Sequence, residues 1–111
     1  MIALCPLDAI DPAGAKGFEV DGYSLLVVRR DRQLFAYHNR CPHLGVELNW
    51  LPDQFLDRDG ELIQCATHGA LFLIDGGRCI AGPCRGKSLQ PIPCALVDGH
   101  IAIAPDWPVS G

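Results

Sequence analysis

Short apolar runs separated by polar turn sequences make up most of this chain of 111 residues. The clearest are Leu25 to Val28 and Leu34 to Tyr37, which flank the polar segment Arg29 to Gln33. No stretch keeps the 3.6-residue period of an amphipathic helix, whereas short runs bounded by turn residues are typical of β-strands. The pattern predicts an all-β fold in which the first two runs form a hairpin.

Asp-Gly dipeptides separate many of the apolar runs. They occur at Asp21-Gly22, Asp59-Gly60, Asp75-Gly76 and Asp98-Gly99. Asp-Gly is one of the strongest local hairpin signals, because both residues tolerate the positive φ angles of tight hairpin turns. Several small antiparallel strands are therefore expected.

Length and charge restrict the class of protein. A chain of 111 residues can support one independent core, so we expect a single domain over residues 1–111. The net charge of −4 argues against a nucleic-acid partner, since phosphate binding requires a basic face. The first residues lack a signal-peptide pattern, and no apolar stretch approaches the roughly 20 residues of a spanning helix. We therefore expect a cytoplasmic protein with no membrane partner.

Six cysteines in so short a chain raise the question of disulfides. Because 49% of the residues are hydrophobic and no secretion signal is seen, reduced thiols are the better expectation. Whether Cys79 and Cys84 pair with each other is left open by the sequence. Metal binding is the better explanation for two of the other cysteines.

Two segments each hold one thiol and one imidazole: Cys41-Pro42-His43-Leu44-Gly45 and Cys65-Ala66-Thr67-His68-Gly69. On the predicted fold, both are loops at strand ends. Two cysteines and two histidines from separate loops are the ligand set of a Rieske [2Fe-2S] centre, in which two histidines replace two cysteines on one iron. A structural Cys2His2 zinc site uses the same residue types, but its ligand pairs usually have Cys-x2-4-Cys spacing.

The two motifs resemble those of Rieske ferredoxins and of the Rieske domains of larger oxidoreductases, which carry Cys-x-His-x-Gly and Cys-x-x-His-Gly. The resemblance includes Phe72 and Gly82-Pro83, which is similar to the proline loop that covers the cluster in this family. It extends over roughly residues 18–104. The resemblance implies a small Rieske-type antiparallel β-sandwich or barrel with two cluster-binding loops.

The same resemblance implies one [2Fe-2S] cluster per chain. Cys41 and Cys65 would bind one iron, and His43 and His68 would bind the other.

The chain departs from the family pattern in two places. Residues 44–64, which separate the two motifs, include additional material at residues 49–56. Within it, Trp50 and Phe55 are candidates either for partner contacts or for packing against the β scaffold. Respiratory Rieske proteins join their cluster loops by a disulfide at positions that correspond here to Val46 and Thr67, and neither residue can form it.

These features predict a one-electron carrier that passes electrons between a reductase and an acceptor such as a terminal oxygenase. The chain is not expected to be an enzyme by itself, because it has no room for a separate substrate domain. The alternatives are a small subunit or regulatory module of a larger oxidoreductase, as in nitrite-reductase-type complexes, and a structural zinc module.

Overall fold

The computed structural model describes residues 2–42, 47–49, 53–67 and 69–104. These residues form ten β-strands and one short 3₁₀ helix, Leu7–Ala9. The strands pair in antiparallel fashion throughout. The prediction of an all-β fold built from small antiparallel strands is therefore confirmed.

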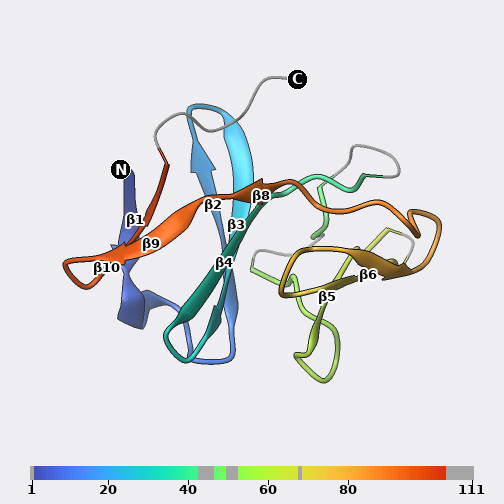
Figure 1. Ribbon diagram of the computed structural model, residues 1–111, viewed down its shortest axis with the longest axis horizontal. Helices are drawn as coiled ribbons and strands as arrows, with labels where there is room; N and C mark the ends of the chain where they lie inside the picture. The colour runs from blue at the N-terminus through green and yellow to red at the C-terminus, as the bar shows by residue number, and fades with distance from the viewer. Residues whose placement is uncertain (1, 43–46, 50–52, 68, 105–111) are drawn as a thin grey trace.

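The strands form three sheets that follow one another across the molecule (Figure 1). The middle sheet has the order β2 (Ala15–Val20), β3 (Tyr23–Arg30), β4 (Gln33–His38) and β8 (Pro91–Ile92). On one side lie β1 (Ile2–Pro6), β10 (His100–Ile103) and β9 (Cys94–Val97). On the other side lie β5 (Leu62–Gln64), β6 (Leu71–Leu73) and β7 (Cys79–Ala81).

Strand β3 separates two hydrophobic cores. Because successive side chains of a strand point to opposite faces, Leu26 and Val28 contribute to one core while Leu25 and Val27 contribute to the other. All four side chains are fully buried. The uninterrupted apolar run that predicted this strand therefore reflects a sheet covered on both faces.

The first core lies between the middle sheet and the β5–β7 sheet. Its buried residues are Leu26, Val28, Tyr37, Cys41, Leu48, Phe55, Ile63, Cys65, Ala70, Phe72, Cys79, Cys84 and Leu89. The second core lies between the middle sheet and the sheet that contains β10. Its buried residues are Ile10, Leu25, Val27, Ala36, Ile92, Ile101 and Ile103.

The predicted β3–β4 hairpin is present, but its loop is shorter than expected. Only Asp31 and Arg32 connect the strands, because Arg29 and Arg30 continue β3 and Gln33 begins β4. The guanidinium of Arg29 donates hydrogen bonds to backbone carbonyls at the 3₁₀ helix and just after it. Because these carbonyls solvate its charge, Arg29 can lie within a strand.

The Asp-Gly pairs behave as expected. The pairs at residues 21–22, 75–76 and 98–99 lie in the connections between consecutive strands, and the pair at residues 59–60 turns the chain before β5. Asp21 and Asp98 adopt positive φ angles of 52° and 51°. Each is followed by a glycine that also has positive φ, as tight hairpin turns require.

The described part of the additional segment packs against β2. Phe55 is only 1% exposed, and its ring lies against Gly17. Asp53 accepts a hydrogen bond of 2.8 Å from the Gly17 N–H and lies 3.5 Å from the Lys16 ammonium. The packing interpretation is therefore confirmed for Phe55, whereas Trp50 lies outside the described residues.

Within the described residues, no helix is long and apolar enough to cross a membrane.

Candidate metal centre

The first ligand loop begins directly after β4 and is organised by a buried asparagine. Asn39 is 5% exposed, and its side-chain oxygen accepts a hydrogen bond of 2.8 Å from the Leu48 N–H. Its side-chain amide donates to Ser24 Oγ at 3.0 Å and to Asn49 Oδ1 at 2.9 Å. Asn39 thus ties the two ends of the loop that contains Cys41 to each other and to β3.

The second ligand loop joins β5 to β6 as a tight turn. The Cys65 N–H donates to the Ala70 carbonyl at 2.8 Å, and the Gly69 N–H donates to the Cys65 carbonyl at 2.8 Å. Gly69 has a φ of 69°, in the left-handed region that glycine adopts without strain. Its role as a turn residue therefore accounts for its place after the histidine.

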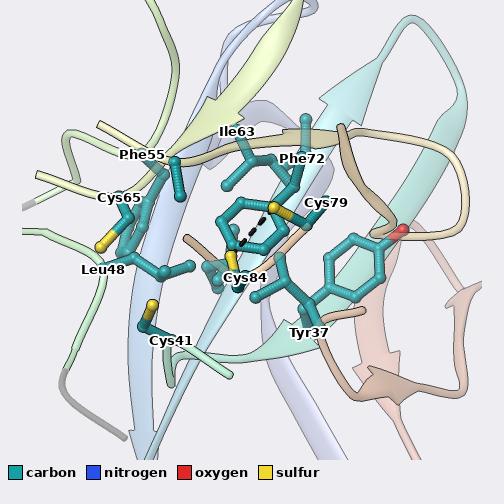
Figure 2. Packing of buried hydrophobic residues seen from close by; sticks show 13 residues of the cluster. Tyr37, Cys41, Leu48, Phe55, Ile63, Cys65, Phe72, Cys79 and Cys84 are labelled. Carbon is teal, nitrogen blue, oxygen red and sulfur yellow. Dashed lines mark hydrogen bonds between the residues drawn. The ribbon is translucent and has the colours of Figure 1, made fainter. Parts of the chain in front are cut away.

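One backbone hydrogen bond connects the two ligand loops. The Ala66 N–H donates to the Leu48 carbonyl at 2.7 Å. Since Leu48 is itself held by Asn39, the positions of the two loops depend on each other. Figure 2 shows Cys41 and Cys65 at the same margin of the first core, with Leu48 between them.

The structure brings together the two cysteines of the predicted ligand set. Cys41 is 1% exposed, Cys65 is fully buried, and both are free thiols in the same core. His43 and His68 lie outside the described residues, as do Gly45 and Val46. The four-residue ligand set therefore stays a prediction, while the two buried thiols on adjoining loops fit the thiolate half of a Rieske centre.

The Gly82-Pro83 segment lies against the second ligand loop. Gly82 has a φ of 99°, and a Cβ atom built on it would approach the Ala70 Cα to 2.8 Å. Only glycine allows this approach of the two backbones. The loop then turns back, with an N–H···O bond of 2.9 Å from Lys87 to Cys84 and one of 2.8 Å from Cys79 to Lys87. This contact agrees with the expectation that the Gly82-Pro83 loop adjoins the metal centre.

Asn39 is the site residue that the sequence did not identify. It has no ligand spacing, and its partners Ser24, Leu48 and Asn49 lie 9 to 15 residues away along the chain. The one available signal was a polar residue two positions before Cys41, directly after an apolar strand.

Comparison with known proteins decides the family. The sequence model of the Rieske [2Fe-2S] domain matches residues 1–101. The chain belongs to this family. The cofactor of this Rieske protein is accordingly a Rieske-type [2Fe-2S] cluster, and the family assignment takes precedence over the zinc alternative.

Relatives of this Rieske protein include ferredoxins of oxygenase systems. The ferredoxin component of the alkene monooxygenase system of Xanthobacter autotrophicus is 30% identical over 104 residues, which cover 92% of this chain and 79% of the relative. The ferredoxin of carbazole 1,9a-dioxygenase from Nocardioides aromaticivorans has a TM-score of 0.77 at 25% identity. That match covers 94% of this chain and 96% of the other.

A Rieske domain within a larger protein has the same fold. A quaternary ammonium Rieske monooxygenase matches with a TM-score of 0.76 at 22% identity, covering 99% of this chain but 34% of its own.

Proposed function

We propose that this Rieske protein is the ferredoxin of an oxygenase system, a single-domain cytoplasmic carrier that passes one electron at a time from a reductase to a terminal oxygenase. The observation that carries the proposal is its similarity to two ferredoxins of oxygenase systems over 79% and 96% of their lengths. The six free thiols are consistent with a reducing compartment.

The ligand assignment is part of the same proposal. Cys41 and Cys65 supply thiolates to one iron, and His43 and His68 supply imidazoles to the other. The bound cluster accepts and returns one electron. Neutral imidazoles in place of two thiolates make the centre less negative, which is why Rieske potentials lie at about −150 to +300 mV while plant-type ferredoxins lie near −400 mV.

The protein scaffold holds the two thiols in place and excludes water behind them. Leu48 lies between the two cysteines in Figure 2, and both Leu48 and Phe72 are fully buried in the same core, so the protein side of the centre is apolar. The ligands lie on loops at strand ends, and a rigid sheet can hold such loops at its surface, where a partner can approach. An electron carrier needs both a rigid ligand set and a short distance between the cluster and the surface that its partner contacts.

Iron analysis with histidine variants tests the ligand assignment. The purified protein should hold two irons and two acid-labile sulfides per chain and show a Rieske-type electron paramagnetic resonance signal when reduced. His43→Ala or His68→Ala should abolish stable cluster assembly, because each variant removes an iron ligand. His100→Ala is the matched control. His100 is exposed, and its ring lies within hydrogen-bond distance of the Asp98 carbonyl, in the turn between β9 and β10.

Two results would contradict the proposal. Stoichiometric zinc without iron after anaerobic purification would exclude the cluster, and a fully loaded His43→Ala protein would exclude the ligand assignment. Rapid mixing of the reduced protein with an oxidised Rieske oxygenase tests the carrier role. Failure to transfer electrons, together with permanent association with a large subunit, would instead indicate a module of a larger oxidoreductase.

A further inference from the structure

Cys79 and Cys84 place their sulfur atoms close together beside the metal centre. Both residues are free thiols, and their Sγ atoms are 2.9 Å apart. The dashed line in Figure 2 marks the hydrogen bond between them. A disulfide bond is about 2.05 Å long, so a movement of less than an ångström would bring the atoms to bonding distance. Cys79 begins β7, and Cys84 follows the Gly82-Pro83 segment.

The two thiols form a directed hydrogen-bond chain in the reduced state. The Cys84 thiol donates to Cys79 Sγ, and the Cys79 thiol donates to the Ala81 carbonyl at 3.2 Å. Burial, together with the bond to Cys79, raises the pKa of the Cys84 thiol to about 12. Cys84 is buried in the same core as Cys41.

A surface groove leads to one of the two thiols. Its lining residues are Leu73, Arg78, Cys79, Ile80, Arg85 and Gly86. Cys79 is part of this lining and Cys84 is not, although each residue is only 1% exposed, so the groove gives an approach to the Cys79 side of the pair. Arg78 and Arg85 are exposed and give the groove a positive charge. An anionic low-molecular-weight disulfide such as glutathione disulfide has the complementary charge.

We propose that Cys79 and Cys84 are a reversible thiol–disulfide modification site whose oxidant is an anionic low-molecular-weight disulfide, and whose state alters the adjacent cluster. The Cys79 sulfur attacks one sulfur of the small disulfide, and one thiol leaves with the Cys79 proton. The Cys84 sulfur then attacks Cys79 Sγ, and the second thiol leaves with the Cys84 proton. One protein S–S bond forms, two S–H bonds break, and the small disulfide is reduced to two thiols.

The new bond would tie the Gly82-Pro83 segment covalently to β7. Gly82 lies against Ala70 in the second ligand loop, and Cys84 is buried in the same core as Cys41. Closing the bond moves the Cys84 sulfur and removes its S–H group, so the surroundings of the cluster change, and such surroundings control reduction potential. This effect on the cluster rests on the proposed function, whereas formation of the disulfide does not.

Oxidation of the holoprotein with glutathione disulfide under anaerobic conditions tests the proposal. After denaturation, free thiols are alkylated and the peptide that contains residues 79–84 is mapped by mass spectrometry. The wild type should lose two hydrogen atoms, retain no glutathione and carry a Cys79–Cys84 bond that dithiothreitol reverses. The cluster potential, measured before oxidation, after it and after reversal, should shift and return.

Two variants identify the order of attack. Cys84→Ala removes the resolving thiol, so Cys79 should keep a glutathione adduct, whereas Cys79→Ala should acquire neither an adduct nor the bond. Cys94→Ala is the matched control, because this free thiol lies in β9 away from the groove, and it should behave as the wild type.

The possible outcomes separate the parts of the inference. Alkylation of both Cys79 and Cys84 in oxidised wild type, or a disulfide to any other cysteine, would overturn the modification site. A mapped disulfide with an unchanged potential would overturn the effect on the cluster. A disulfide in a protein that never holds iron would overturn the proposed function and leave the thiol site standing.

Discussion

At the scale of single residues, the loop that carries Cys41 is held by a buried side chain outside the predicted ligand set. Asn39 satisfies the Leu48 N–H and is itself satisfied by Ser24 and Asn49. Buried polar groups contribute little net free energy when fully paired, but they cost the full desolvation penalty when a partner is removed. Asn39 therefore holds the first ligand loop in place, because any movement that breaks its hydrogen bonds leaves buried polar groups without partners.

Replacement of Asn39 should destabilise the loop that carries Cys41. Asn39→Ala leaves the Leu48 N–H without its side-chain acceptor, and we expect a loss of about 1–3 kcal/mol in the free energy of unfolding. Because Leu48 also accepts the bond from the second loop, the rate of iron release should rise as well. Denaturant unfolding and the time course of iron release at fixed temperature measure the two effects.

Ser24→Ala is the control for this prediction. It removes one acceptor of the Asn39 amide but keeps the bond from Leu48 to Asn39. Iron release should therefore stay close to the wild-type rate. Equal release from both variants would show that the Leu48 contact does not hold the loop.

The contrast between Cys41 and Asn39 shows what the sequence could reveal at this scale. The cysteine belongs to a motif whose residue types and spacing indicate metal binding, so it could be proposed as a ligand from the local sequence. The asparagine acquires its role only when the fold brings β3 and residue 48 beside it. No local pattern specifies those neighbours.

At the scale of elements, the predicted strands were found and their boundaries differed. The sequence pattern places Arg29 and Arg30 in the polar segment between the two apolar runs. In the structure Arg29 instead reaches the carbonyls of Leu7 and Ile10, which lie in another part of the chain. Strand ends of this kind depend on tertiary partners, whereas Asp-Gly turns depend on local backbone preference and were predicted correctly.

The packing of the Gly82-Pro83 loop on the second ligand loop gives an element-scale prediction. Gly82→Ala places a Cβ atom 2.8 Å from the Ala70 Cα, in addition to the strain of a φ of 99°. Backbone must move, so the loop should separate from Ala70, with lower iron retention and a changed cluster potential. Iron content after gel filtration and voltammetry of the loaded fraction measure these changes.

Gly86→Ala distinguishes crowding from backbone strain. Gly86 has a similar φ of 91°, but a Cβ atom there meets no atom within 4 Å. Gly86→Ala should lower the free energy of unfolding by about 1–3 kcal/mol, because alanine is strained at this φ, and it should leave the cluster potential unchanged. If Gly86→Ala shifted the potential as much as Gly82→Ala, contact with Ala70 would not be the cause.

At the scale of the whole molecule, the middle sheet separates two hydrophobic cores, and one of them contains the candidate cluster cysteines. The first core contains the candidate cluster cysteines and the Cys79–Cys84 pair, while the second joins β1, β9 and β10 to the sheet. Neighbouring residues of β3 face opposite cores, and Leu25 and Leu26 are both fully buried. They form a natural pair for asking whether the metal centre depends on one core or on overall stability.

Leu25→Ala and Leu26→Ala should have similar effects on stability and different effects on the cluster. Each removes a buried leucine side chain, so each should lower the free energy of unfolding by about 2–5 kcal/mol. Only Leu26→Ala opens space in the core that contains Cys41 and Cys65, so only this variant should release iron faster at temperatures well below unfolding. Calorimetry gives the melting temperature of each variant. The rate of iron release is then measured for each at the same number of degrees below its own melting temperature. Equal release from the two variants would show that the cluster responds to global stability and not to the core beneath it.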